Sequence, residues 1–124
     1  MLFLPGMMDL SGIRSFCLSL PAVTEDIKWE QHLCFSVGAK MFLITSPYEV
    51  PVTASVKVSE DEFHTLITRA GIRPASDLGR YHWIEVDDIS RLSAMQWRHY
   101  LTEAHRLVAS KLPKSEKKRL GLYG

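Results

Sequence analysis

Apolar residues recur along this chain with two different periods, and the changes of period predict where helices and strands lie. Between residues 10 and 20 they follow helical spacing, with Asp9 as the cap of that helix and Pro21 at its end. From residue 26 to residue 58, alternation and short apolar runs take over, which is typical of strands. We expect these strands at residues 26–30, 33–37, 41–44 and 52–58.

Helical spacing returns in the second half of the chain. A capping box at residues 59–62 begins a helix that Gly71 ends, and a second box at residues 93–96 begins the last helix. Between these helices, residues 81–86 are predicted to form a strand. The last helix carries a broad apolar stripe, formed by Trp97, Tyr100, Leu101, Ala104, Leu107 and Val108.

The predicted order is helix, four strands, helix, strand, helix. Consecutive strands joined by short turns pair antiparallel, so the pattern indicates an α+β fold with one antiparallel sheet of about five strands and helices packed on one face. We expect a single domain at residues 9–113, preceded by an N-terminal extension at residues 1–8. A basic C-terminal tail is expected at residues 114–124.

The composition is that of a globular protein. Of the 124 residues, 46% are hydrophobic and 23% are charged, and no apolar run approaches the roughly 18 residues that span a bilayer. The apolar start lacks a basic region and is interrupted at Pro5, so it does not resemble a signal peptide. We expect a cytoplasmic monomer that does not associate with membranes and whose Cys17 and Cys34 stay reduced.

The net charge of +1 conceals an asymmetry along the chain. Residues 1–110 carry ten Lys and Arg against thirteen Asp and Glu, whereas residues 111–124 carry five against one. A basic tail of this kind adds affinity for phosphates. Alternatively, it is a solvated, frayed chain end that only keeps the protein in solution.

The common sequence signatures of catalysis are missing. The seven glycines form no phosphate-binding loop, and the five histidines include no pair spaced for a metal site. No serine lies in the elbow motif of hydrolases. We therefore expect a non-enzymatic protein with no catalytic residue, metal or cofactor.

The stretch GRYHWIEVDD, residues 79–88, is the best candidate for a binding site. On a strand its alternate apolar residues face the core, so Tyr81 and Trp83 would lie together on the open face, beside Arg80. Unstacked bases are held on aromatic surfaces of this kind, which predicts DNA or single-stranded nucleic acid as the partner. The predicted binding residues are Lys40, Arg80, Tyr81, Trp83, Lys114, Lys117, Lys118 and Arg119.

Two alternatives to this interpretation stay open. The aromatic side chains could form a structural corner, packed against Trp29 or covered by the loop at residues 73–79. The same open face could instead bind a protein or a small molecule. Salt distinguishes these ligands from nucleic acid, because phosphate contacts weaken steeply with added salt and apolar contacts do not.

Five short segments, in order along residues 9–118, carry a recognisable pattern. They are LPAV at 20–23, KW at 28–29, VGAKMF at 37–42, GIRPA with RYHW at 71–83, and VASKLPK at 108–114. Together they resemble the MmcQ/YjbR-like family. Two pairs depart from its pattern: Ser76-Asp77 replaces the usual Pro-Tyr, and Ala104-His105 replaces a frequent Ser-Tyr.

The resemblance implies a bacterial-type domain of unsettled function. Its fold would be a sandwich similar to the bacterial frataxin homologue CyaY and to double-wing modules, and DNA binding is suggested for such domains by analogy of fold. Iron binding of the frataxin type requires an acidic ridge on the first helix. Here Asp9 is the one acidic residue before Pro21, so iron handling is not expected to transfer.

Overall fold

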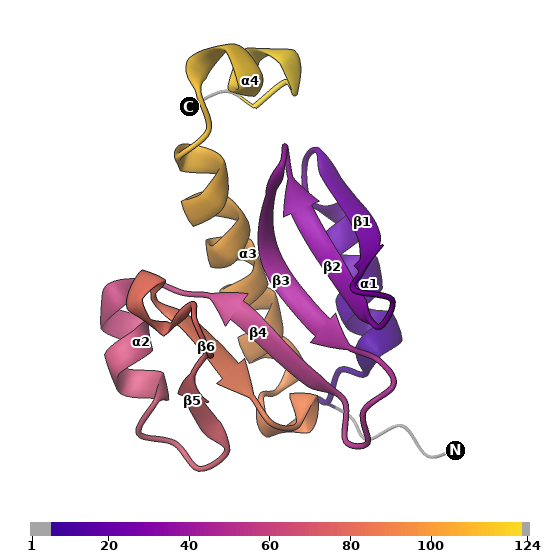
Figure 1. Ribbon diagram of the computed structural model, residues 1–124, viewed down its shortest axis with the longest axis vertical. Coiled ribbons are helices and arrows are strands. Elements are labelled where there is room, and N and C mark those ends of the chain that lie inside the picture. The colour runs from indigo at the N-terminus through magenta and orange to yellow at the C-terminus, as the bar shows by residue number, and fades with distance from the viewer. Residues whose placement is uncertain (1–5, 123–124) are drawn as a thin grey trace.

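Six strands form one antiparallel sheet in the order β1-β2-β3-β4-β6-β5 (Figure 1). This computed structural model describes residues 6–122. The strands are β1 (Val23–Lys28), β2 (His32–Val37), β3 (Lys40–Ser46), β4 (Thr53–Lys57), β5 (Ile72–Pro74) and β6 (Trp83–Val86). The predicted α+β class is confirmed, with one strand more than expected because β5 is too short to show a pattern.

Helices cover one face of the sheet and leave the other face open (Figure 1). They are α1 (Leu10–Ser19), α2 (Glu60–Leu66), α3 (Ala94–Ser110) and α4 (Lys114–Arg119), with 3-10 turns at Gly79–Tyr81 and Ile89–Arg91. Helix α1 packs behind β1 and α3 behind β3 and β4, while α2 lies beside β5 and β6. None of these helices is long and apolar enough to cross a membrane.

Polar caps fix where the first and third helices begin, as the sequence predicts. At α1, Asp9 Oδ1 accepts a hydrogen bond from the Gly12 amide at 2.9 Å. At α3, the Gln96 amide donates to Ser93 Oγ (3.1 Å) and the Ser93 amide donates to Gln96 Oε1 (2.9 Å), which completes a capping box. These bonds satisfy amides that the helix itself leaves without partners.

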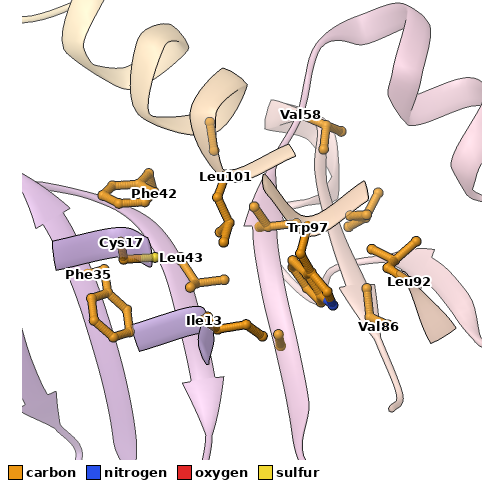
Figure 2. Close-up of a cluster of buried hydrophobic side chains, with 14 of the residues drawn as sticks. Ile13, Cys17, Phe35, Phe42, Leu43, Val58, Val86, Leu92, Trp97 and Leu101 are labelled. Atoms are coloured by element: carbon orange, nitrogen blue, oxygen red, sulfur yellow. The ribbon is translucent and has the colours of Figure 1, made fainter. Parts of the chain in front are cut away.

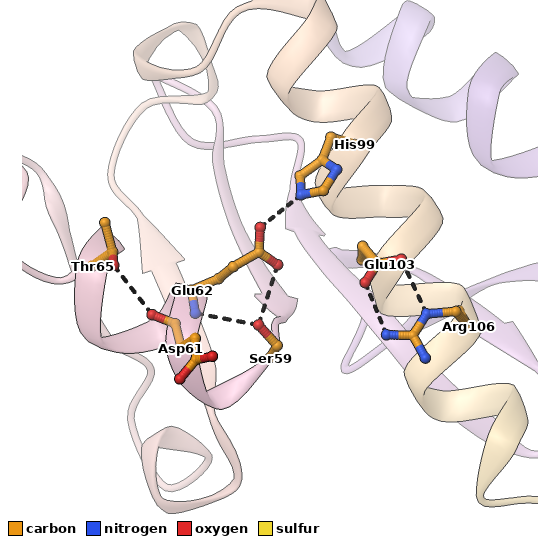
Figure 3. A network of polar contacts seen from close by, with 7 residues as sticks. All are labelled: Ser59, Asp61, Glu62, Thr65, His99, Glu103 and Arg106. Atoms are coloured by element: carbon orange, nitrogen blue, oxygen red, sulfur yellow. Dashed lines mark hydrogen bonds and ion pairs between the residues drawn. The ribbon is translucent and has the colours of Figure 1, made fainter.

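A polar network joins α2 to α3 (Figure 3). Ser59 caps α2 by accepting a hydrogen bond from the Glu62 amide at 3.2 Å. The Glu62 carboxylate then reaches across to His99 Nε2 on α3, at 2.6 Å. One turn further along α3, Arg106 and Glu103 form an ion pair at 2.8 Å. The network holds α2 beside the C-terminal end of β4.

The hydrophobic core lies between the sheet, α1 and α3 (Figure 2). Trp97 is fully buried there, and its indole Nε1 donates a hydrogen bond to the Ile89 carbonyl at 2.7 Å, so its polar atom is satisfied. The register of β2 and β3 shifts between Phe35 and Ser36. This bulge lets the consecutive residues Phe42 and Leu43 both be buried.

The first strand differs from the prediction in its bounds. It begins at Val23 and ends at Lys28, whereas the alternation suggested residues 26–30. Trp29 and Glu30 have positive φ angles of 54° and 65° and form the turn before β2. The Trp29 side chain is consequently 63% exposed at the tip of this hairpin.

Both predicted chain ends pack on the domain as far as the structure describes them. Met8 belongs to the buried core, and the Ala94 amide donates a hydrogen bond to the Gly6 carbonyl at 2.7 Å. After α4, Leu120 and Leu122 pack against the core. The alternative of a frayed tail is therefore wrong for residues 114–122. The rest of the predicted extension and tail, residues 1–5 and 123–124, lies outside the described residues.

Candidate nucleic-acid interface

The stretch that the sequence indicated as a binding site is a turn followed by a strand. Residues Gly79–Tyr81 form the 3-10 turn, and His82 adopts the left-handed conformation (φ 63°, ψ 41°) before β6 begins at Trp83. Alternation of side chains holds only within a strand. The prediction that Tyr81 and Trp83 share one exposed face is therefore wrong.

Trp83 is a structural residue. It pairs with Lys57 of β4, yet it is only 7% exposed. The Ala75 amide donates to the Trp83 carbonyl (2.9 Å), and the Trp83 amide donates to the Leu78 carbonyl (3.3 Å). These bonds tie Trp83 to the loop at residues 73–79, and its burial agrees with the alternative of a structural corner. Trp83 is thus removed from the candidate surface.

Tyr81 remains available on the surface. Its side chain is 53% exposed, and the Arg80 guanidinium carbon lies 4.9 Å from the centre of its ring, at cation–π distance. Lys57 Nζ donates a hydrogen bond to the Tyr81 carbonyl. Partial burial, assisted by the nearby charge of Lys111, lowers the pKa of Lys57. Tyr81 is therefore next to Lys57, and Lys57 has Lys111 close by.

Ion pairing divides the lysines into two groups. Among residues 6–122, Lys28 is the one lysine with a carboxylate partner, Asp26 at 3.4 Å. The other lysines come from the start of β3, the end of β4, the end of α3, and α4. We call them the basic end; they are Lys40, Lys57, Lys111, Lys114, Lys117 and Lys118.

Tertiary packing brings the basic end together. The β2–β3 hairpin turns at Gly38, where a Cβ atom would lie 3.2 Å from Leu112 and 3.5 Å from Leu120. Gly38 has a φ of 62°, so the close approach and the left-handed backbone both favour glycine. Figure 1 shows α4 above this hairpin, on the same end of the molecule as the start of β3.

Arg119, also a predicted binding residue, is engaged within α4. Its guanidinium makes two hydrogen bonds to the Glu116 carboxylate, at 2.6 and 2.9 Å. These bonds lower the pKa of Glu116, so the carboxylate stays charged and neutralises Arg119. Four predicted lysines, Lys40, Lys114, Lys117 and Lys118, thus come from elements that meet where the β2–β3 hairpin approaches α4, while Arg119 is paired. Two lysines that were not predicted, Lys57 and Lys111, lie close enough for the charge of Lys111 to lower the pKa of Lys57.

The open sheet face carries a further hollow that the sequence did not indicate. It has a volume of about 350 Å³ and lies over β2, β3 and β4, lined in part by His32, Ser46 and Ser55. His32 Nδ1 and Ser46 Oγ are 3.1 Å apart, at hydrogen-bond distance. Two exposed aromatic residues, Trp29 and Tyr48, come from the turns at this end of the sheet. Only strand pairing brings these residues together, so no local motif could have revealed them.

This chain is similar to a known protein family and to solved structures. A family model described as YjbR matches residues 18–107. The Deinococcus radiodurans protein DR2400, which carries a DUF419 domain, is 27% identical with a TM-score of 0.84, over 98% of this chain and 94% of that one. A Pseudomonas syringae protein is 20% identical with a TM-score of 0.66, over 82% and 99%, and shows the shared fold alone. No curated protein matches the chain.

Proposed function

The chain belongs to the YjbR family, and we propose that it binds nucleic acid through its basic end, with Tyr81 and Arg80 at the edge of the contact surface. The observation that supports this proposal is the segregation of the lysines. Every lysine but Lys28 lacks an ion-pair partner among residues 6–122, and the start of β3 and α4, which together carry four of them, lie at the same end of the molecule (Figure 1). Unpaired ammonium groups on one surface attract a polyanion because each can replace a counterion at a phosphate.

The exposed ring of Tyr81 favours single-stranded over duplex nucleic acid. Bases stack on aromatic rings only where they are free of their own partners, and an arginine beside the ring adds a cation for the neighbouring phosphate. Because Lys57 is hydrogen-bonded to the Tyr81 carbonyl, the aromatic group and the basic end are contiguous. A single-stranded oligonucleotide that contacts the basic end with its phosphates is thus expected to stack a base on the Tyr81 ring.

Fluorescence anisotropy with labelled single-stranded and duplex oligonucleotides tests the proposal. The logarithm of the binding constant should fall linearly with the logarithm of salt concentration, with a slope of about −0.7 per phosphate contact for a single strand. The double variant Lys114→Ala/Lys118→Ala should reduce the steepness of this slope by about one to one and a half units.

Arg98→Ala provides the matched control for these lysine variants. Arg98 is exposed and has no ion-pair partner within residues 6–122, but it lies on α3 roughly 20 Å along the helix axis from Lys111. Its removal changes the net charge without touching the basic end, so the slope should stay that of the wild type. Absence of oligonucleotide binding by the intact protein at low salt would refute the proposed function.

A second candidate function is binding of a protein or small molecule on the open sheet face. The hollow over β2, β3 and β4 favours it, together with the exposed side chains of Trp29 and Tyr48 at 63% and 75%. Exposed aromatic residues beside a polar hollow are typical of binding surfaces. A partner captured there should bind with little dependence on salt, and Trp29→Ala should weaken it.

A further inference from the structure

A cavity of about 460 Å³ lies where the end of α3, the segment after α4 and the α1–β1 corner meet. Its apolar walls include Pro21, Ala109 and Leu122. Volumes of roughly 300–1,000 Å³ are typical of small-molecule sites. The cavity is separate from the hollow on the open sheet face, because α3 packs on the opposite side of the sheet.

His105 forms a rigid wall of this cavity. Its Nε2 lies 2.8 Å from the Pro21 carbonyl oxygen, and because a carbonyl can only accept, this nitrogen carries the hydrogen. The ring also packs edge-on against Phe42 of β3, with centroids 5.8 Å apart. The imidazole is 8% exposed and held on two sides, so this wall of the cavity is packed in place.

The charges on the cavity wall leave one free cation among the described residues. Arg106 lines the cavity, but its guanidinium is bound twice by the Glu103 carboxylate, at 3.0 and 2.8 Å. Lys117 also lines the cavity and has no ion-pair partner within residues 6–122. One uncompensated ammonium group beside apolar walls suits a ligand with a single negative charge and an apolar body.

We propose that this cavity binds a small monocarboxylate with an apolar chain. The carboxylate pairs with the Lys117 ammonium, and the chain lies against Pro21, Ala109 and Leu122. A phosphate dianion fits less well, because Arg106 is already neutralised and a second positive charge is missing from the wall. The site shares Lys117 with the basic end, but none of the other five lysines of the basic end lines it, and neither does Arg80 or Tyr81.

Heteronuclear NMR with ¹⁵N-labelled protein and octanoate as the probe tests this site. Saturable shifts are expected at the amides of Ala109, Ser110, Gly121 and Leu122, which line the cavity. Octan-1-ol has the same chain without the charge and should bind about fivefold more weakly, as expected for the loss of a partly exposed ion pair. Inorganic phosphate has the charge without the chain and should cause no saturable shifts at these amides.

Two variants and a matched control locate the ligand. Lys117→Ala should weaken octanoate binding about fivefold and bring it to the level of octan-1-ol, whereas Lys118→Ala, one residue along α4, should leave it unchanged. Ala109→Phe should fill the cavity and abolish binding of both probes. Both variants should retain the wild-type pattern of amide signals elsewhere in the spectrum.

Octanoate shifts that map to the open sheet face, or equal affinity of the wild type and Lys117→Ala for octanoate, would rule out a carboxylate site here. If Ala109→Phe fails to fold, the comparison of Lys117→Ala with Lys118→Ala decides the question alone. Oligonucleotide binding by Ala109→Phe should match the wild type, so failure of the cavity site and failure of the nucleic-acid function remain distinguishable.

Discussion

Replacing Tyr81 and Trp83 one at a time distinguishes a residue that binds nucleic acid from one that stabilises the fold. Trp83 is 7% exposed, and truncating a buried large aromatic side chain costs roughly 3–5 kcal/mol, through the lost transfer energy and the cavity left behind. We therefore expect Trp83→Ala to lower the free energy of unfolding by about that amount. Tyr81 is 53% exposed, and Tyr81→Ala should cost less than about 1 kcal/mol.

Binding should respond in the opposite way. Stacking of a base on an exposed ring is worth roughly 1–3 kcal/mol, so Tyr81→Ala should weaken binding of a single-stranded oligonucleotide about fivefold or more. Tyr81→Phe keeps the ring and removes only the hydroxyl group, so it should bind like the wild type. Trp83→Ala should bind normally to the extent that it remains folded.

Urea denaturation followed by circular dichroism gives the stability of each variant, and anisotropy under native conditions gives the affinity. A loss below about 1 kcal/mol for Trp83→Ala would mean that the indole is not buried. Equal affinities of Tyr81→Ala and the wild type would remove the corner from the interface. A reduced salt slope in the Lys114→Ala/Lys118→Ala variant would still assign binding to the basic end.

Three further predictions concern stability and reactivity. Trp97→Ala should cost roughly 3–5 kcal/mol in urea denaturation, since the indole is fully buried and hydrogen-bonded to Ile89; a loss under about 1 kcal/mol would contradict this packing. A chain ending at Pro113 should melt about 5 °C or more below the wild type, because Leu120 and Leu122 no longer cover the core, and an unchanged melting temperature would contradict their packing. Burial raises the pKa of the Cys17 thiol to about 12, so a disulfide reagent at pH 8 should modify it only in denaturant, and rapid reaction of the native protein would argue against its burial.

The elements that the sequence predicted well are those whose pattern reflects burial directly. The stripe led by Trp97 has helical spacing because α3 lies along the sheet with one face in the core. The caps at Asp9 and Ser93 could be recognised because a helix start needs an acceptor for its first amides. Helical spacing and capping both depend on residues a few positions apart, so they can be recognised from the sequence alone.

The candidate site depended on conformations that no local pattern reveals. His82 adopts a positive φ of 63° although it is not glycine, and this single residue separates Tyr81 from the strand that begins at Trp83. If the strand alternation is extended back through His82, the Tyr81 side chain is assigned to the same face of the sheet as Trp83, which is wrong. Likewise, β5 has three residues, one of them Pro74, and exists because it pairs with β6.

The frayed tail, one of two alternatives for the basic C-terminus, is wrong for a related reason: packing against distant parts of the chain orders it. A helix of six residues such as α4 is not stable alone in water, so contacts of Leu120 and Leu122 with the core must hold it. Lysines on a frayed tail would lose backbone freedom when they bind a polyanion, at roughly 1–2 kcal/mol per ordered residue. Lysines on a packed α4 have already lost that freedom during folding. The same charges are therefore better prepared to contact phosphates in this structure than on the frayed tail that the sequence left as an alternative.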